Sequence, residues 1–411
     1  MPYCPFCGAI VNDMDINCAV CKAKLPDNYL QINRNEQLSR NEEFLKIQQN
    51  YPQYNYQYPP HEYQSEYPEV EKKRSWASAL YRIFCILISI LLIFAIFQYG
   101  LFEFSPTKYT EVPKFAEFTV ERITTIICIS GSATYELKIP KPKSLKIDNN
   151  PNNEYIQHVV SVSPNGDYIE NNYWYNWEEK ISAGEKHNIK ITYKIKAKTY
   201  KWDIDESNSG TIDDIPKVYA DRYSSEKDEW LIETTNPIVV SLAEQLTKDK
   251  TNVYEKVRAI YLFLKENIKY EIHKEPQSCT TTLQTMTGDC DDQSILFSAL
   301  CRAVGIPAWL EYGFIYDKKN KKWGGHGWAT VCIPLKNGYV ATPSVDVVNK
   351  KFLWEDCYRI TEWVDDGNAE NLKNYYDFFK STSKGNTLIK ITEPYFKTIE
   401  LKTYGSIKIP A

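Results

Sequence analysis

The most apolar stretch of the chain lies between Ile83 and Phe102, where about 20 residues follow one another without a charge. Such a run is long enough to cross the hydrocarbon core of a bilayer as one helix. Aromatic residues, among them Trp76 and Tyr99, stand near both ends, where a membrane interface favours them. The pattern therefore predicts a single transmembrane helix within residues 76–104.

The charges on the two sides of this predicted helix differ. Lys72, Lys73, Arg74 and Arg82 lie on the N-terminal side, whereas Glu103 begins the other flank. Because cytoplasmic flanks are rich in Lys and Arg, we expect a single-pass protein of the cell membrane. Its N-terminus is expected in the cytoplasm and its C-terminal domains outside.

After residue 107 several runs alternate hydrophobic positions with polar ones. Runs such as 117–121 and 187–195 place a hydrophobic residue at every second position. This period is typical of half-buried β-strands. We predict a β-sandwich-like domain over residues 105–232. Further strands are predicted at 381–411, where they complete either this sandwich or the sheet of the domain before them.

A helical period follows, and one helix begins beside a cysteine. From Asp292 onward, apolar residues recur on one helical face until Gly305, with Pro307 just beyond. Cys290 is therefore expected at or just before the first turn of this helix. Free backbone N–H groups and the positive end of the helix dipole favour a thiolate anion at that place.

Composition narrows the class of protein. The chain has 411 residues, of which 25% are charged, and a net charge of −4. This length fits two or three domains, and this charge makes non-specific binding of nucleic acid unexpected. Residues 29–75 are rich in Tyr, Gln and Pro, and their centre has almost no aliphatic side chain to bury. We predict a disordered tether there.

The N-terminal residues 1–28 carry two pairs of cysteines with zinc-knuckle spacing. A tetrahedral zinc ion binds four thiolates in this arrangement, and so short a module needs a metal to fold. Two disulfides or an iron site are the alternatives, and a reducing cytoplasm disfavours the first. With few basic residues, the zinc ribbon is expected to be structural or to dock a cytosolic protein partner. The predicted Zn²⁺ ligands are Cys4, Cys7, Cys18 and Cys21.

Several separate sequence pieces occur in one order between Val253 and Val348. They are the helical run 252–270, Gly-Asp-Cys-Asp-Asp around Cys290, Ala-Leu-Cys-Arg-Ala-Val-Gly-Ile-Pro-Ala at 299–308, and His-Gly-Trp beginning at His326. In these pieces the chain resembles the transglutaminase-like superfamily, which is related to papain.

The resemblance implies an α+β fold with a papain-like transglutaminase core, which we place at residues 233–380. It implies that Cys290 is the nucleophile and that His326 is the general base. The base deprotonates the thiol and later protonates the leaving amine. The backbone N–H of Cys290 is then one oxyanion donor.

The sequence departs from the family at the third catalytic position. Where the family carries Asp-Pro-Thr after a strand, this chain has Thr342-Pro343-Ser344. A threonine hydroxyl can accept a hydrogen bond from the histidine but brings no charge to stabilise an imidazolium. Asp346 lies four residues on and supplies the carboxylate if the turn folds back.

Simpler interpretations stand beside these. A cysteine at a helix start is often a small buried hydrophobe, and a histidine between glycines is often a turn residue. Of the six cysteines after residue 104, five remain if Cys290 is free, and disulfides, such as one from Cys279, are open. The aromatic cluster at 173–177 is expected in the core rather than as a sugar or peptide platform.

Two functions therefore remain from sequence. The first is a membrane-anchored, outward-facing cysteine hydrolase, peptidase or acyltransferase acting on amide bonds of a peptide or protein substrate. Whether water or an amine resolves the acyl-enzyme stays open. The second is a catalytically impaired receptor or scaffold that binds a peptide or cell-surface polymer.

Overall fold

The computed structural model describes residues 109–148, 154–223, 226–383, 387–392 and 394–410. The zinc ribbon with its four cysteines, the tether and the transmembrane helix lie outside these residues, so each stays a prediction. Within the described ranges, no helix combines the length and the apolar character that crossing a membrane requires. The described chain from Tyr109 onward is one compact unit.

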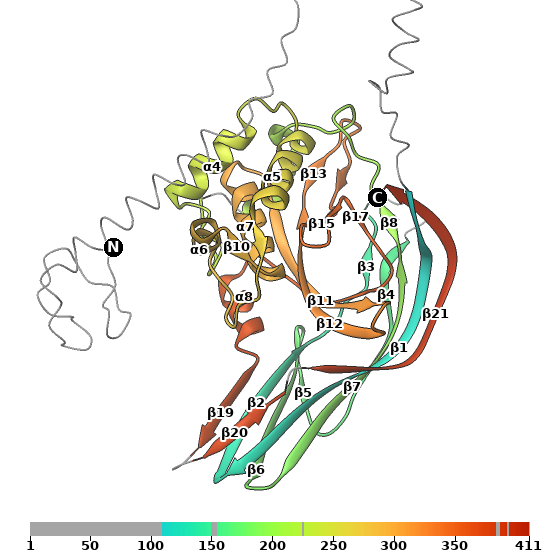
Figure 1. Ribbon diagram of the computed structural model, residues 1–411, viewed down its shortest axis with the longest axis vertical. Helices are drawn as coiled ribbons and strands as arrows, with labels where there is room; N and C mark the ends of the chain where they lie inside the picture. Colours follow the sequence, from blue (N-terminus) through green and yellow to red (C-terminus); the bar gives the residue numbers. More distant parts are fainter. Residues whose placement is uncertain (1–108, 149–153, 224–225, 384–386, 393, 411) are drawn as a thin grey trace, which may run out of the picture. The chain divides into compact units, whose positions relative to one another are not determined.

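The first sheet is built on β1, a strand of 22 residues whose inward-facing positions are buried at every second residue from Phe118 to Cys128. This alternation is the period predicted from sequence, and it is what a sheet with one buried face requires. The sheet order is β20-β1-β7-β4-β3, and β21 also pairs with β1 (Figure 1). Its strands are β1 (Tyr109–Ser130), β3 (Leu145–Lys146), β4 (Tyr155–Pro164), β7 (Lys186–Lys198), β20 (Leu388–Ile391) and β21 (Tyr395–Pro410).

A second sheet has the order β19-β2-β6-β5. Leu137 and Trp177 from this sheet share one buried cluster with Ile126 and Tyr193 from the first. The two sheets therefore enclose a common core. The strands are β2 (Ser132–Pro140), β5 (Ile169–Glu170), β6 (Trp174–Ser182) and β19 (Phe379–Ser383). The C-terminal strands thus join sheets that begin some 250 residues earlier, with β19 on β2 and β20 and β21 on β1.

A layer of helices covers a third sheet, whose order is β16-β15-β12-β11-β18 (Figure 1). Its central helix α7 contacts β11, β12 and the other helices of the layer. The helices are α4 (Pro237–Thr247), α5 (Val253–Asn267), α6 (Cys279–Thr285) and α7 (Cys290–Ala303). The strands are β11 (Ala308–Asp317), β12 (Lys322–Val331), β15 (Ser344–Asp346), β16 (Lys351–Phe352) and β18 (Arg359–Val364). This mixture, with strands dominant, agrees with the predicted α+β core.

Local signals fix the ends of the two longest helices of this layer. Asn252 caps α5, and its side chain accepts a hydrogen bond from the backbone N–H of Glu255. α7 stops at the point predicted from sequence, because Gly305 adopts a φ of +78°, which ends a helix at little steric cost.

Smaller elements complete the described fold. Sequence periodicity predicted strands and no helix between residues 107 and 228, yet a 3-10 turn η1 and the helix α3 occur there. Neither buries a residue, so neither leaves an apolar stripe to detect. The elements are η1 (Ile212–Asp214), α3 (Lys217–Arg222) and α8 (Ala369–Tyr376), with the pairs β8 (Tyr200–Lys201) and β17 (Trp354–Glu355), β9 (Lys269–Tyr270) and β10 (Thr287–Gly288), and β13 (Ile333–Pro334) and β14 (Val340–Ala341).

Buried polar contacts tie the two-sheet region to the helix-covered sheet. The side chain of Gln157 on β4 donates to the carbonyl of Thr361 on β18 and accepts from its N–H. On the same strand β18, Glu362 accepts a hydrogen bond from Tyr193 at 2.6 Å and pairs with Arg122 at 3.2 Å. Because these groups are buried, the contacts hold β18, and the sheet it belongs to, in a fixed relation to the long strands.

The aromatic cluster behaves as a core element. Trp174, Tyr175 and Trp177 are buried, while Tyr173 is 42% exposed. In the described part of the chain all six cysteines are free thiols, including Cys279, so the disulfide left open from sequence is absent there.

Candidate active site

Cys290 is the first residue of α7, as the helical pattern predicted, and Asp289 is the residue that caps the helix. The N–H of Asp289 donates to the carboxylate of Asp292 at 3.2 Å, which closes the first turn. Gly288 permits this approach, since a Cβ there would lie 2.8 Å from the Cβ of Asp292. The thiol is thus set at a helix start whose backbone is fixed locally.

The electrostatics around the thiol differ from the expectation. Burial first, and then the nearby Asp291 carboxyl, raise the pKa of Cys290 to about 12, against a hydrogen bond from the Gly327 backbone that lowers it. Asp289, Cys290 and Asp291 hold their polar atoms within 4.8 Å of one another. The helix start alone predicted a thiolate, but burial between two acidic side chains outweighs the helix dipole, and the resting group is a neutral thiol.

His326 lies on β12, opposite Gly313 on β11, and is buried. Its Nε2 lies 2.9 Å from Oδ2 of Asp346 and 2.9 Å from Nδ2 of Asn349. The ring also stacks against Trp328. With Nε2 engaged by the carboxylate, Nδ1 is the ring nitrogen that remains for the thiol.

Gly327 brings the histidine strand against the cysteine helix. A Cβ at this position would lie 2.8 Å from the Tyr312 ring and 3.4 Å from Cα of Asp291. The residue next to Cys290 and the residue next to His326 are therefore in close contact, and α7 packs on β12. Gly324 and Gly325, by contrast, face open space.

Asp346 ends β15 and is 1% exposed. Its other oxygen accepts a hydrogen bond from the N–H of Asn349 at 3.1 Å. Burial alone would raise the pKa of Asp346, but His326, Arg359 and Lys351 outweigh it and hold this pKa well below its usual range. The carboxyl is therefore ionised beside the imidazole at neutral pH.

Thr342, which stands at the family's aspartate position, does not face the histidine. Its hydroxyl donates to Asp148, in the loop after β3. Of the two candidates that the sequence left for the third residue, the structure brings Asp346 to His326 and turns Thr342 elsewhere.

Arg359 lies next to the carboxylate of Asp346. Its guanidinium lies 3.8 Å from Asp346, donates to Ser344 at 2.9 Å and to Glu355 at 2.8 Å. The same group stacks 3.9 Å above the Trp328 ring. Trp328 therefore contacts both His326 and the Arg359 guanidinium, and this contact fixes the tilt of the imidazole.

Asp291 connects the nucleophile to a pair of tyrosines. The Tyr376 hydroxyl donates to Asp291 at 3.0 Å and lies 2.7 Å from the Tyr312 hydroxyl. Burial, followed by the hydrogen bond to Asp289, raises the pKa of Asp291 to about 8. At neutral pH this carboxyl is protonated, which keeps one negative charge away from Cys290.

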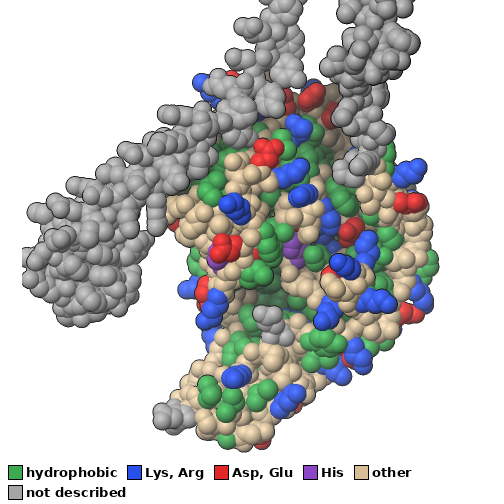
Figure 2. Space-filling view, in the orientation of Figure 1, with side chains coloured by type: hydrophobic (Ala, Val, Ile, Leu, Met, Phe, Trp, Pro, Cys, Tyr) green, Lys and Arg blue, Asp and Glu red, His purple; other side chains and the backbone are tan. Residues whose placement is uncertain are grey.

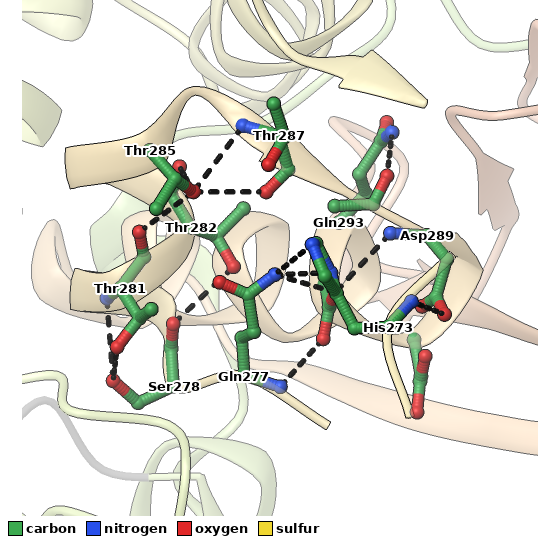
Figure 3. Close-up of polar contacts among 12 residues, drawn as sticks. His273, Gln277, Ser278, Thr281, Thr282, Thr285, Thr287, Asp289 and Gln293 are labelled. Carbon is green, nitrogen blue, oxygen red and sulfur yellow. Dashed lines mark hydrogen bonds and ion pairs between the residues drawn. The ribbon is translucent and has the colours of Figure 1, made fainter. Parts of the chain in front are cut away.

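A second histidine lies on the other side of the helix start. His273 Nδ1 is 2.8 Å from the carboxylate of Asp292, and the N–H of Gln277 donates to the same carboxylate at 2.6 Å. Figure 3 shows His273 and Gln277 converging there, next to Asp289. The hydrogen bond to Asp292 raises the pKa of His273.

Sequence reasoning did not name Asn349, Arg359, Tyr376 or His273. None stands in a motif, and each reaches the site through a fold that spacing does not reveal. One signal was available: Asp289 and Asp292 have the spacing of a capping box, which places Asp292 in the first turn with its carboxylate turned back.

Residues 240–342 match the model of the Transglutaminase-like superfamily. This region is transglutaminase-like. It contains Cys290 and His326 and ends before Asp346. The match supports a cysteine hydrolase or a transglutaminase-like function, in agreement with the resemblance drawn from the motifs.

Two solved structures resemble the chain at low identity. A proposed cysteine protease from Cytophaga hutchinsonii is 14% identical, and the alignment covers 73% of this chain and 98% of that one with a TM-score of 0.48. A proposed protease from Parabacteroides distasonis is 13% identical, with 64% and 48% covered and a TM-score of 0.25. A search of curated proteins found no match.

Proposed function

We propose that this protein is a cysteine hydrolase or acyltransferase that attacks amide carbonyls through Cys290. The observation that carries the proposal is the carboxylate of Asp346, 2.9 Å from Nε2 of His326 and buried with it. A buried ionised carboxylate at this place orients the ring and stabilises an imidazolium.

The chemistry follows from this arrangement. His326 takes the proton of Cys290, and the sulfur attacks the amide carbon while the carbonyl π electrons move to oxygen. The oxyanion meets the N–H groups at the start of α7. When the C–N bond breaks, the imidazolium gives its proton to the leaving amine, and an acyl thioester remains. Water then yields an acid, whereas a second amine yields a new amide, and Cys290 regains its proton in either case.

The proposal includes a membrane anchor and a zinc ribbon, and both rest on the sequence alone. A basic N-terminal flank and an uncharged run at 83–102 favour an outward-facing site on the cell surface. Four cysteines in the reducing compartment favour zinc and a cytosolic protein partner there.

The test uses the full-length protein and an iodoacetamide probe, with Cys290 labelling measured by mass spectrometry between pH 5 and 10. If the proton passes to His326, Cys290 is labelled near neutral pH, and His326→Ala removes that labelling. If no such transfer occurs, a thiol whose pKa is about 12 stays unreactive across this range. Products from a peptide library, with and without an added primary amine, then separate hydrolysis from acyl transfer.

A second function, binding without catalysis, is favoured by one observation. The raised pKa of Cys290 opposes thiolate formation in the resting protein. Under this alternative the cleft holds a peptide or surface polymer and the thiol is inert. Absence of labelling at every pH, in a protein that still binds peptide, would select it.

A further inference from the structure

A short exposed strand runs beside the nucleophile. β9 (Lys269–Tyr270) pairs in parallel with β10, whose last residue Gly288 lies two positions before Cys290. The N–H of Lys269 donates to Met286, and the N–H of Glu271 donates to Gly288 at 3.3 Å. Both bonds face β10. By the alternation of a strand, the N–H and C=O of Tyr270 face the opposite edge, and no described residue bonds to them there.

That edge also presents apolar side chains to solvent. Ile272 is 76% exposed, the largest value among the big hydrophobic side chains of the described chain, and Tyr270 is 56% exposed. Single exposed hydrophobic residues are common, but two within three positions beside a candidate nucleophile are not scattered. Figure 2 shows hydrophobic side chains and a histidine beside a hollow on the face of the molecule that it draws.

Tyr270 is close to the reacting atoms. Burial of the covered part of its ring raises the pKa of Tyr270, and a thiolate at Cys290 would raise it as well, so the two side chains lie near each other. The pairing of Tyr270 with Gly288 gives the same placement independently. A chain lying along β9 would therefore pass next to the thiol.

The segment after β9 is fastened to the start of α7. His273 binds the carboxylate of Asp292 at 2.8 Å, and its N–H donates to Asp289 at 3.4 Å. The N–H of Gln277 donates to Asp292 at 2.6 Å, and Asp292 is fully buried. These contacts (Figure 3) fix the edge of β9 relative to Cys290 before any ligand arrives, which lowers the entropic cost of binding.

We propose that the free edge of β9 binds the backbone of an extended polypeptide, and that Tyr270 and Ile272 contact apolar side chains of that polypeptide. The inference rests on the proposed function, since the bound strand presents its amide to Cys290. It names the substrate class as an extended protein segment with an apolar residue near the attacked amide. Asp289 and Glu271 beside the edge disfavour acidic side chains there.

Strand addition of this kind takes affinity from main-chain hydrogen bonds and selectivity from alternate side chains. A polymer without backbone N–H and C=O groups in register, such as a glycan, would leave the Tyr270 groups unpaired. The geometry therefore favours polypeptide over sugar as the ligand.

The test measures peptide binding apart from chemistry. In full-length protein carrying Cys290→Ala, a fluorescent acetyl-Ala-Leu-Gly-Ala amide is titrated by anisotropy. Ile272→Ser and Tyr270→Ser are each expected to weaken binding about tenfold, because each removes apolar contact. Ile169→Ser is the matched control: Ile169 is 67% exposed on β5, and its replacement should leave binding unchanged.

The backbone contact has its own probe. Two further versions of the peptide each lack one N–H donor. One is methylated on the leucine nitrogen, and the other on the nitrogen of the alanine that precedes it. Neighbouring N–H groups of a strand face opposite edges, so one of the two versions should bind about tenfold more weakly. The inference is overturned if the Ile272 and Tyr270 variants bind like the Ile169 control and neither methylation matters. Iodoacetamide labelling of the wild type reports separately on Cys290. If Cys290 is not labelled but the peptide still binds at the β9 edge, only the proposed function is contradicted, and the inference about the edge stands.

Discussion

The two sides of the candidate site hold buried carboxyl groups whose surroundings act in opposite directions. On the strand side, the pKa of Asp346 lies well below its usual range, because His326, Arg359 and Lys351 outweigh its burial. On the helix side, burial and Asp289 raise the pKa of Asp291 to about 8. One carboxyl is therefore a permanent anion, and the other is neutral at physiological pH.

The difference assigns separate tasks to the two sides. On the strand side, the carboxylate of Asp346 is already ionised and stabilises the imidazolium when it forms. The helix side is kept as neutral as two acidic side chains allow, so that a thiolate there meets the least repulsion. A site of this kind keeps the negative charge next to the base that receives the proton of Cys290.

The largest expected effect comes from removing the strand-side charge. Asp346→Asn keeps the size of the side chain but leaves His326 without an anion, and the labelling rate of Cys290 at pH 7 should fall about 10³-fold or more. Thr342→Ala is the matched control, because Thr342 binds Asp148 and not the ring, and it should change the rate less than about twofold. Equal effects of the two substitutions would contradict the assignment of Asp346.

The same variant has a signature in stability. Asp346 has a lowered pKa in the folded state, so it stabilises the fold above the ordinary pKa of an aspartate, and this contribution disappears as pH falls. Asp346→Asn should therefore melt lower than wild type at pH 7, with the gap closing toward pH 3. A gap that is independent of pH would mean that the carboxylate is not charged in the folded protein.

The contact between the two sides gives the next effect. Gly327→Ala puts a methyl group 2.8 Å from the Tyr312 ring and 3.4 Å from Cα of Asp291, so β12 or the ring must shift beside the start of α7. A misplacement of this order should lower the labelling rate about 10²-fold. Gly325→Ala, two positions earlier, meets open space and should behave as wild type in the same assay. Thermal melting of both variants shows whether the fold itself has been lost.

Sequence reasoning was strongest where a local pattern decides the outcome. The alternation in β1 and the start of α7 at Cys290 follow from nearest neighbours along the chain, and both are seen. The order of the motifs pointed to a transglutaminase-like region, which the superfamily match supports. The pairing of β21 with β1 was only one of two options, because strand partners so far apart leave no trace in spacing.

The site was less readable, and the reasons are physical. Whether Asp346 or Thr342 faces His326 depends on how the turn at 342–344 folds. The identities of these two residues do not determine the conformation of that turn. The pKa of Cys290 was expected in the wrong direction, because a helix start is visible in sequence while burial between acidic groups is not. Asn349 reaches His326 from a turn, and Arg359 reaches Asp346 from β18, so only the three-dimensional structure reveals them.

Asn349 offers a smaller test of the strand side. Its amide lies 2.9 Å from both His326 and Asp346, and it donates its backbone N–H to the same carboxylate. Asn349→Ala removes only the side-chain contacts, so labelling at pH 7 should slow by about threefold to tenfold. Asn337→Ala, whose side chain accepts one bond from Tyr339 in an exposed turn, is the control. A loss as large as that of Asp346→Asn would make the amide, and not the carboxylate, the decisive partner.

The helix side predicts the smallest effect and a distinctive pH dependence. Below about pH 8, Asp291 carries a proton, and Asp291→Asn should label at nearly the wild-type rate. Above that pH the wild type gains a negative charge beside the thiol, and the variant does not, so the variant should label about threefold to tenfold faster at pH 9.

Stability and the tyrosine contact make this last prediction specific. Because the pKa of Asp291 is raised on folding, the folded protein binds more protons than the unfolded chain between about pH 4 and pH 8. Its stability falls across that window, and Asp291→Asn should gain in relative melting temperature as pH rises through it. Tyr376→Phe removes a hydrogen bond that lowers the pKa of Asp291, so the break in the wild-type labelling profile should move to higher pH. If the labelling rate changes at the same pH in both variants as in the wild type, that change comes from the titration of another group. The assignment of the raised pKa to Asp291 would then be wrong.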